Sequence, residues 1–269
     1  MPVNSVVVLG VPSDRHSSFL RGAAGAPARI REALRSGSMN TWSESGRDIL
    51  TSGKVADVGD VSDVDGEGGF DRVEEAVSAI LSGNNRLLVL GGDHAITYPV
   101  LKAVAAHHGP ITLIHLDAHP DLYDIYEGDR LSHACTMARI MEEGLARRLI
   151  QIGIRASNGH QLAQAERFGV ETYEMKSIRD IRGVPVSPLE APVYLTLDLD
   201  VLDPAYAPGV SHFEPGGMSV RDLLSFIQAL PVLVGADLVE YNPERDPSGV
   251  TAMVAVKLMK EILDRMAPE

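Results

Sequence analysis

The chain has 269 residues, 45% hydrophobic and 23% charged, a composition typical of a folded globular protein and not of a disordered one. Its 37 acidic side chains outnumber the 24 basic ones, and this excess argues against a surface for nucleic acid, which needs clustered Lys and Arg. Cys135 is the only cysteine, which excludes an intrachain disulfide and a zinc site made of several thiolates.

The N-terminus shows no targeting signal. The first four residues, Met1-Pro2-Val3-Asn4, contain no charged region, and the apolar run 6–11 is too short for the core of a signal peptide. No apolar stretch approaches the roughly 18 residues that a membrane-spanning helix needs. We therefore expect a protein without membrane contact that resides in the cytoplasm.

Short apolar runs alternate with helical patterns along the whole chain. The runs that predict strands are Ser5–Val11, Arg86–Leu90, Ile111–Leu116, Leu149–Ile154, Val193–Leu197 and Leu233–Leu238. The patterns that predict helices are Pro27–Leu34, Arg72–Ser82, Tyr98–His107, Thr136–Glu143, Gln161–Phe168, Val220–Leu230 and Val250–Met266. The runs are rich in Val, Ile and Leu without clean alternation, as in strands buried on both faces of a parallel sheet.

This alternation predicts an α/β fold, with three α/β/α layers and a mostly parallel central sheet. No Pro-, Ser- or Gly-rich linker and no internal repeat divides the sequence, so residues 1–269 are expected to form one domain. In open α/β sheets, ligands bind at the carboxyl ends of the strands. The residues that directly follow each run are therefore the first functional candidates.

Histidines and carboxylates follow four of the predicted strands. The segments are Gly-Gly-Asp-His at 91–94, Asp-Ala-His-Pro-Asp at 117–121, Asp-Leu-Asp at 198–200 and Glu-Tyr-Asn at 240–242. Because these segments share one edge of the predicted sheet, their side chains are expected to line one cleft. The candidates are His94, Asp117, His119, Asp121, Asp198, Asp200 and Glu240.

The spacing of these residues predicts a metal site. In an extended chain alternate side chains point the same way, so Asp117, His119 and Asp121 can converge, and so can the two carboxylates of segment 198–200. Grouped carboxylates repel one another unless cations neutralise them. With His94 the set offers four carboxylates, two imidazoles and no thiolate, which favours ions such as Mn²⁺ over sulfur-bound zinc. Six ligands exceed the needs of one ion with open positions, so two ions about 3.5–4 Å apart are expected.

The other histidines give weaker signals. His115 lies inside a predicted strand, where a core role is expected. His16, His160 and His212 fall in predicted loops, where surface or supporting roles are the default. His133 lies in the loop downstream of segment 117–121, close enough in sequence to fold back over the metals. It is therefore a catalytic candidate.

These motifs resemble those of the arginase and agmatinase (ureohydrolase) family, and are most similar to plant-type arginases. The resemblance covers nearly the whole chain. The segments that carry it are GGDHAI at 91–96, DAHPDLYD at 117–124, SHA at 132–134, LDLDVLDPAYAPGVSHFEPGG at 197–217 and DLVEYNPERD at 237–246.

The resemblance implies an arginase-like fold, a homotrimer or homohexamer, and a small cationic guanidino substrate that is hydrolysed to urea and an amine. His133 would be the proton-shuttling histidine, and Glu240 would bind the substrate guanidinium. A guanidinium is planar, resonance-stabilised and permanently charged, so its uncatalysed hydrolysis is slow. The ligands of two Mn²⁺ ions per subunit would be His94, Asp117, His119, Asp121, Asp198 and Asp200.

The residues around the rest of the substrate depart from animal arginases. Segment 122–127 lacks the Asn and Ser that bind an α-carboxylate there, and Asn158 replaces an Asp that helps to bind the α-amino group. Arg15, Arg21 and Arg155 are candidates to bind a carboxylate. We expect L-arginine as substrate, with urea and ornithine as products. Agmatine or another ω-guanidino acid is the alternative, and a binuclear-metal phosphoesterase or a silent metal-binding protein represents a different class.

Overall fold

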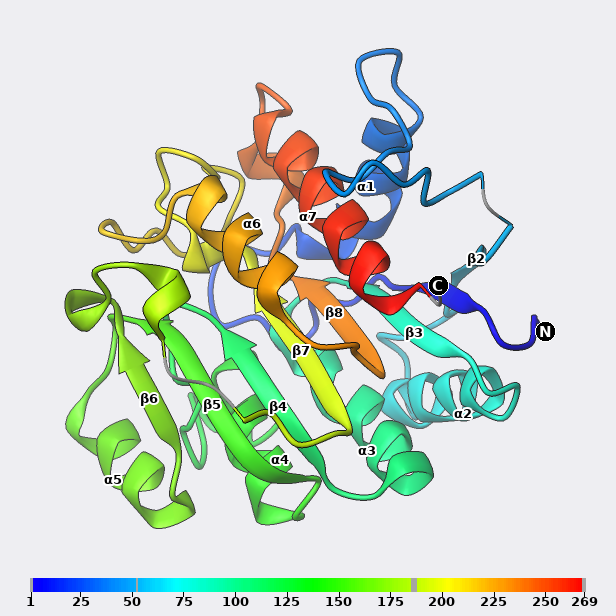
Figure 1. The fold of residues 1–269 in the computed structure, drawn as a ribbon. Helices are drawn as coiled ribbons and strands as arrows, with labels where there is room; N and C mark the ends of the chain where they lie inside the picture. Colours follow the sequence, from blue (N-terminus) through cyan, green and yellow to red (C-terminus); the bar gives the residue numbers. More distant parts are fainter. Residues whose placement is uncertain (1, 52, 185–187, 268–269) are drawn as a thin grey trace.

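The computed structural model describes residues 2–51, 53–184 and 188–267, which form one eight-stranded sheet whose paired strands all run parallel (Figure 1). The order across the sheet is β2-β1-β3-β8-β7-β4-β5-β6. The strands are β1 (Val6–Val11), β2 (Val55–Asp60), β3 (Arg86–Gly91), β4 (Ile111–Leu116), β5 (Ala146–Ile154), β6 (Glu171–Glu174), β7 (Val193–Asp198) and β8 (Gly235–Val239).

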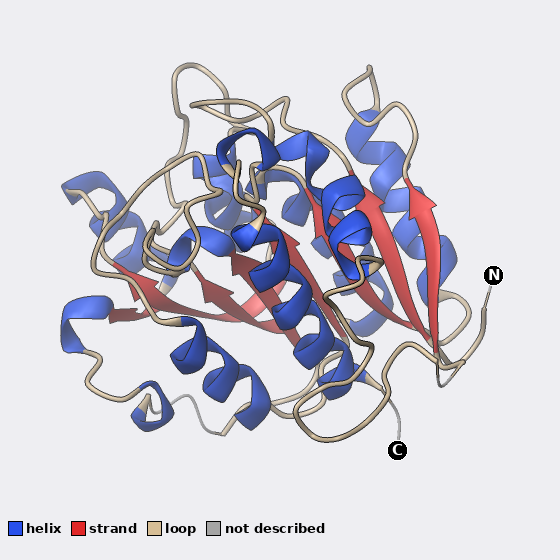
Figure 2. Cartoon of the chain, turned by 90° about the horizontal axis from the view of Figure 1, so that it is seen from above, coloured by secondary structure: helices blue, strands red, loops and turns tan. Residues whose placement is uncertain are grey.

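Helices cover both faces of the sheet (Figures 1 and 2). The first face is covered by α1 (Ala26–Leu34), α6 (Val220–Ala229) and α7 (Val250–Met266). The second face is covered by α2 (Gly69–Leu81), α3 (Thr97–His108), α4 (Thr136–Glu142) and α5 (Gly159–Phe168). The predicted α/β class, its three layers and its parallel sheet are confirmed.

The core consists of two apolar layers separated by the sheet. Val6 and Val8 of β1 belong to the layer under α1, α6 and α7, whereas Val7 and Leu9 belong to the layer under α2 to α4. A strand that is buried on both sides favours apolar residues on both of its faces. This explains why the strand-forming runs show no polar alternation.

Two strands were not predicted, and both lie at an edge of the sheet. β2 and β6 each have one neighbouring strand and are only partly buried. Their sequences, VADVGD and ETYE, contain charged residues because one side of an edge strand can face water. The predicted start of β5 was three residues late, and β8 runs from 235 to 239, not from 233 to 238.

The helix ends follow local sequence rules. Ser219 caps α6, since its hydroxyl accepts from the backbone N of Asp222, whose carboxylate accepts from the backbone N of Ser219. The buried face of the same helix contributes Leu223 and Ile227 to the core. Within the described ranges, the helices are too short or too polar to cross a bilayer.

Candidate metal centre

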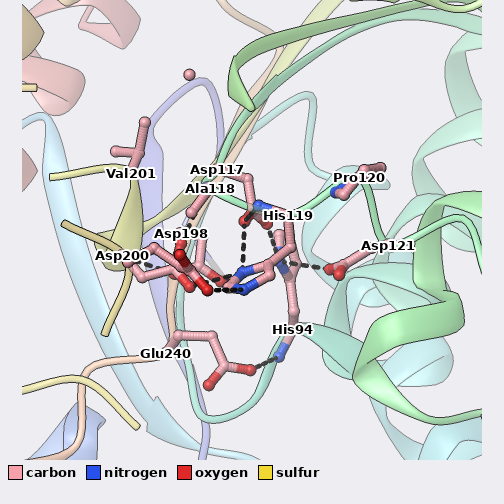
Figure 3. A network of polar contacts seen from close by, with 12 residues as sticks. His94, Asp117, Ala118, His119, Pro120, Asp121, Asp198, Asp200, Val201 and Glu240 are labelled. Carbon is pink, nitrogen blue, oxygen red and sulfur yellow. Dashed lines mark hydrogen bonds and ion pairs between the residues drawn. The ribbon is translucent and has the colours of Figure 1, made fainter. Parts of the chain in front are cut away.

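The strand order places the four motif-bearing strands next to one another. β3, β8, β7 and β4 are consecutive in the sheet, and because they are parallel their carboxyl ends share one edge. The segments that follow them therefore meet, as the sequence predicted. Figure 3 shows the result, with Asp198 and Asp200 on one side of two imidazoles, Asp121 on the other and Glu240 beneath.

The imidazole of His94 is buried among three carboxylates. Its Nδ1 lies 3.1 Å from Oδ2 of Asp117, 3.2 Å from Oδ2 of Asp121 and 3.3 Å from Oδ2 of Asp198. This Nδ1 nevertheless has no hydrogen-bond partner. Buried polar atoms without a partner are costly, and one divalent cation would satisfy this nitrogen and the surrounding oxygens together. The donor set of oxygens and imidazole nitrogen fits the predicted kind of ion.

A second group forms around His119. Its Nδ1 lies 2.9 Å from Oδ2 of Asp200 and 3.5 Å from Oδ1 of Asp117. Asp117 thus offers one oxygen to each group, and a site for a metal ion can be drawn at either. The structure brings together all six side chains that the spacing selected. Their role as ligands stays a prediction.

Burial and mutual repulsion perturb the ionisation of these groups. Burial, together with the charges of Asp200 and Asp117, raises the pKa of Asp198 well above its ordinary value. Burial lowers the pKa of His119, but the carboxylates of Asp200 and Asp117 outweigh it and raise this pKa to about 12. The site therefore attracts positive charge, which protons or metal ions can supply.

The ligand segments are turns, and not the extended chain that the spacing argument assumed. Oδ1 of Asp117 accepts from the backbone N of His119 at 2.6 Å, and Oδ1 of Asp198 accepts from that of Asp200 at 2.8 Å. Asp121 has a left-handed backbone with φ of 52°. The predicted convergence is correct, but its reason was wrong, because short Asp-centred turns bring the groups together.

His133 and Glu240 lie beside the metal groups in the same cavity. Nδ1 of His133 is 2.8 Å from Oε1 of Glu240, which also accepts from the backbone N of His94 at 2.8 Å. Both side chains are buried, and they line a cavity of about 170 Å³. Ser18, which the sequence did not single out, contacts Nε2 of His133 through its backbone N at 3.1 Å and its Oγ at 2.7 Å.

His115 is a partner of the site and not a free core residue. Nε2 of Gln151 donates to the carbonyl of Pro120 at 2.6 Å, so this atom must be the amide nitrogen, and it also lies 3.0 Å from Nδ1 of His115. Nδ1 therefore accepts, and Nε2–H of His115 donates to Oδ2 of Asp117 at 2.7 Å. With both ring nitrogens engaged, His115 orients Asp117.

The loop histidines are closer to the site than the sequence suggested. The ring centroid of His212 lies 5.5 Å from those of both His119 and His133, so it forms part of the cavity wall. Nδ1 of His16 lies 2.7 Å from Oδ2 of Asp129, and its backbone N donates to the buried carboxylate of Asp93. Folding of long loops onto the strand ends, which spacing does not reveal, explains both positions.

The three arginines proposed to bind a substrate carboxylate do not line this cavity. The guanidinium of Arg155 donates to the backbone carbonyls of residues 153, 200, 201, 202 and 214. Arg15 donates to the carbonyls of residues 65 and 66, and Arg21 to that of Arg15. Arg155 therefore fixes the loop after β7, and the expectation that it binds substrate is wrong.

Comparison with known proteins identifies the family. A model of the arginase family matches residues 4–264. The chain belongs to the arginase family. Arginase 1 of Arabidopsis thaliana is 46% identical over 98% of this chain and 81% of its own, and an agmatinase of Bacillus cereus is 35% identical over 97% and 91%. The arginase structure from Medicago truncatula superposes with a TM-score of 0.91 at 43% identity, covering 99% of this chain and 89% of that chain.

Family membership settles several expectations from the sequence. The protein is an enzyme of the ureohydrolase class, a metal-dependent family, and its His/Asp groups are suited to binding metal. The predicted cytoplasmic location is contradicted, because similar plant arginases are named mitochondrial or chloroplastic/mitochondrial. That prediction rested on the absence of a recognisable signal, which was weak evidence.

Proposed function

We propose that the protein hydrolyses the guanidino group of L-arginine to urea and ornithine, with two Mn²⁺ ions per subunit. The observation that carries this proposal is the buried Nδ1 of His94, which faces three carboxylates without a hydrogen-bond partner beside a cavity that contains Glu240. Similarity to plant arginases supports arginine as the substrate.

The two groups would hold the ions from different strand ends. His94, Asp121 and Asp198 would bind one ion, His119 and Asp200 the other, and Asp117 would contribute an oxygen to each. When bound, two such ions supply Lewis acidity that lowers the pKa of a water molecule toward neutrality. Four carboxylates and two imidazoles without sulfur are ligands that suit Mn²⁺.

Glu240 would bind and orient the guanidinium. Burial raises its pKa, but the charge and hydrogen bond of His133 and the backbone N of His94 lower it below the ordinary value, so Glu240 is ionised near neutral pH. Its Oε1 is occupied by those two donors. Oε2 remains for charge-assisted hydrogen bonds to the planar cation, which such bonds hold in one orientation.

His133 would provide the proton that the leaving amine needs. Burial lowers its pKa, but the charge and hydrogen bond of Glu240, with Asp121 and Asp93, raise it to about 9. Below about pH 9 the ring therefore binds a further proton on Nε2, which in the neutral ring accepts from the backbone N of Ser18 at 3.1 Å. A general acid that is positioned in this way protonates an amine as it departs.

Agmatine, which has no carboxylate, is a second candidate substrate, and the residues that line the cavity are compatible with it. Tyr123, Tyr126 and Gln161 line it, and in the described chain no Lys or Arg does. The Oε1 of Gln161 is buried without a hydrogen-bond partner, so it can accept from an ammonium group, which both substrates carry. A carboxylate, which of these two substrates only arginine carries, would find the hydroxyls of Tyr123 and Tyr126 there.

We also propose that residues 1–269 act as one domain and that the protein assembles as a homotrimer or homohexamer. The span of the family match, residues 4–264, supports a single unit. Light scattering coupled to size-exclusion chromatography gives the mass in solution and tests the assembly. A monomer would overturn it.

The deciding experiment measures urea release from the Mn²⁺-loaded protein with L-arginine, agmatine and 4-guanidinobutyrate under identical conditions. We expect the highest kcat/KM with L-arginine. A preference for agmatine would show that the proposed substrate is wrong and that the proposed hydrolysis of a guanidino group is right. Hydrolysis of a phosphate ester without urea from any guanidino compound would overturn the proposed function.

A further inference from the structure

Two buried polar side chains stand behind His94 inside the sheet. Thr196 of β7 and Asp237 of β8 are paired across the parallel strands, and both are completely buried. Nε2 of His94 lies 2.8 Å from Oγ1 of Thr196, which lies 2.6 Å from Oδ1 of Asp237. Both residues lie between buried apolar neighbours in their strands, so core packing does not explain them.

The hydrogen atoms in this Asp237–Thr196–His94 relay have a defined direction. Oδ2 of Asp237 accepts from the hydroxyls of Thr97 and Tyr194, each at 3.1 Å, and Oδ1 accepts from Thr196. Thr196 has one hydroxyl hydrogen and gives it to the carboxylate, so its oxygen accepts from Nε2–H of His94. Neutral His94 then carries its lone pair on Nδ1, the atom that faces the three carboxylates.

We propose that Thr196 and Asp237 are positioning residues that fix the tautomer and ring orientation of His94, and so set the affinity for the metal ion of the His94 group. The inference rests on the proposed function, because it concerns an ion that this function requires. Ligating histidines commonly donate their second N–H to a carboxylate or carbonyl, which holds the ring in place. Here a threonine hydroxyl lies between the imidazole and the carboxylate.

The relay acts on one of the two metal groups. His119 is partly exposed, and its Nε2 lies 3.9 Å from Oε1 of Glu214, beyond hydrogen-bond distance. Among the described residues, no buried hydroxyl or carboxylate lies within hydrogen-bond distance of Nε2 of His119, whereas Thr196 does so for Nε2 of His94. Loss of the relay should therefore weaken one of the two Mn²⁺ equivalents and spare the other.

The test compares Thr196→Val, which keeps the shape and removes the hydroxyl, with Thr196→Ser, which keeps the hydroxyl. Thr112→Val is the matched control, because Thr112 is also a buried strand threonine, with its hydroxyl bonded to the carbonyl of Glu190. Each full-length protein is stripped with chelator and titrated with Mn²⁺, and free Mn²⁺ is measured by electron paramagnetic resonance. Thermal unfolding of the stripped proteins monitors the fold.

We expect Thr196→Val to weaken one Mn²⁺ equivalent about 10- to 100-fold, whereas Thr196→Ser and Thr112→Val stay within about threefold of the wild type. Asp237→Asn should weaken the same equivalent. Wild-type Mn²⁺ affinity in Thr196→Val, or an equal loss of Mn²⁺ affinity in the Val and Ser variants, would overturn the proposed role of the relay but not the proposed function. Wild-type protein that binds two Mn²⁺ but releases no urea would overturn the proposed function alone, and wild-type protein that binds no Mn²⁺ would overturn both.

Discussion

Glu240→Gln isolates the charge that binds the guanidinium while keeping the shape of the side chain. Oε1 of Glu240 accepts from the backbone N of His94 and from Nδ1 of His133, each at 2.8 Å. A glutamine can keep both bonds only if its carbonyl oxygen takes the place of Oε1. Its NH₂ group then occupies the place of Oε2 and presents donors to a substrate that itself has only donors on its guanidinium.

The size of the effect follows from burial. Glu240 is 5% exposed, so its charge is poorly screened by solvent. Removing one partner of a buried ion pair costs about 3–5 kcal/mol, because the other charge is left uncompensated. At 1.36 kcal/mol for each tenfold in rate, this predicts a fall in kcat/KM of roughly 150- to 5,000-fold.

The assay is steady-state urea release by Mn²⁺-loaded wild type, Glu240→Gln and the control Glu214→Gln. Glu214 also lies near the site, but its side chain is 39% exposed, so its loss should cost less than about fivefold. Metal content is measured on the same samples, and Glu240→Gln should retain both ions. A fully loaded Glu240→Gln enzyme within tenfold of wild type would refute the assigned role.

Three further predictions concern the site, and one concerns a remote network. His133→Ala should lower kcat about 10²- to 10⁴-fold with metal retained, and unchanged turnover would remove His133 from the mechanism. Asp198→Ala should lose bound metal, measured by elemental analysis; two retained ions per subunit would refute its ligand role. Burial lowers the pKa of His119, but Asp200 and Asp117 raise it to about 12, so a Mn²⁺ ion that binds there must displace a proton. The affinity of the protein for Mn²⁺ should therefore rise from pH 6 to pH 9. Binding that does not depend on pH would contradict this. Hydrogen bonds from α6 lower the pKa of Glu44, so the contribution of Glu44 to the stability of the fold is present above about pH 4.5 and is lost as pH falls. The difference in melting temperature between wild type and Glu44→Gln should therefore shrink from pH 7 to pH 3. A constant difference would argue against this contribution.

The sequence was most informative where both faces of an element are buried. The apolar runs of β1, β3, β4 and β7 are continuous because α-helices cover both sides, and the predicted positions agree with the structure within a residue or two. The edge strands β2 and β6 were missed because partial exposure removes that signal. The order of strands, which brings β3, β8, β7 and β4 together, depends on packing between distant segments, and local patterns do not contain it.

In the site, the sequence predicted the residues that follow strands and missed those that support them. Ser18 reaches His133 across 115 positions, so spacing along the chain gives no hint of the contact. Thr196 and Asp237 did leave a signal, since each is a polar residue within an apolar run. A polar side chain in a strand that is buried on both faces needs a hydrogen-bond partner, and a search for that partner among the predicted site residues would have suggested His94.

Two residues at the site have left-handed backbone conformations, which residues other than glycine rarely adopt. Asp121 has φ of 52° and Glu240 has φ of 64°. Each such conformation costs on the order of 1–3 kcal/mol and persists only where neighbours fix it. The carbonyl of Asp121 accepts from the backbone N of Met137 at the start of α4, and the backbone N of Glu240 donates to the carbonyl of Gly92 after β3. These bonds hold both carboxylates at the cavity, although burial opposes the charge of each and the charge of Asp117 also opposes that of Asp121. The covered sheet supplies the stability for that arrangement, and bound cations would offset the repulsion that remains.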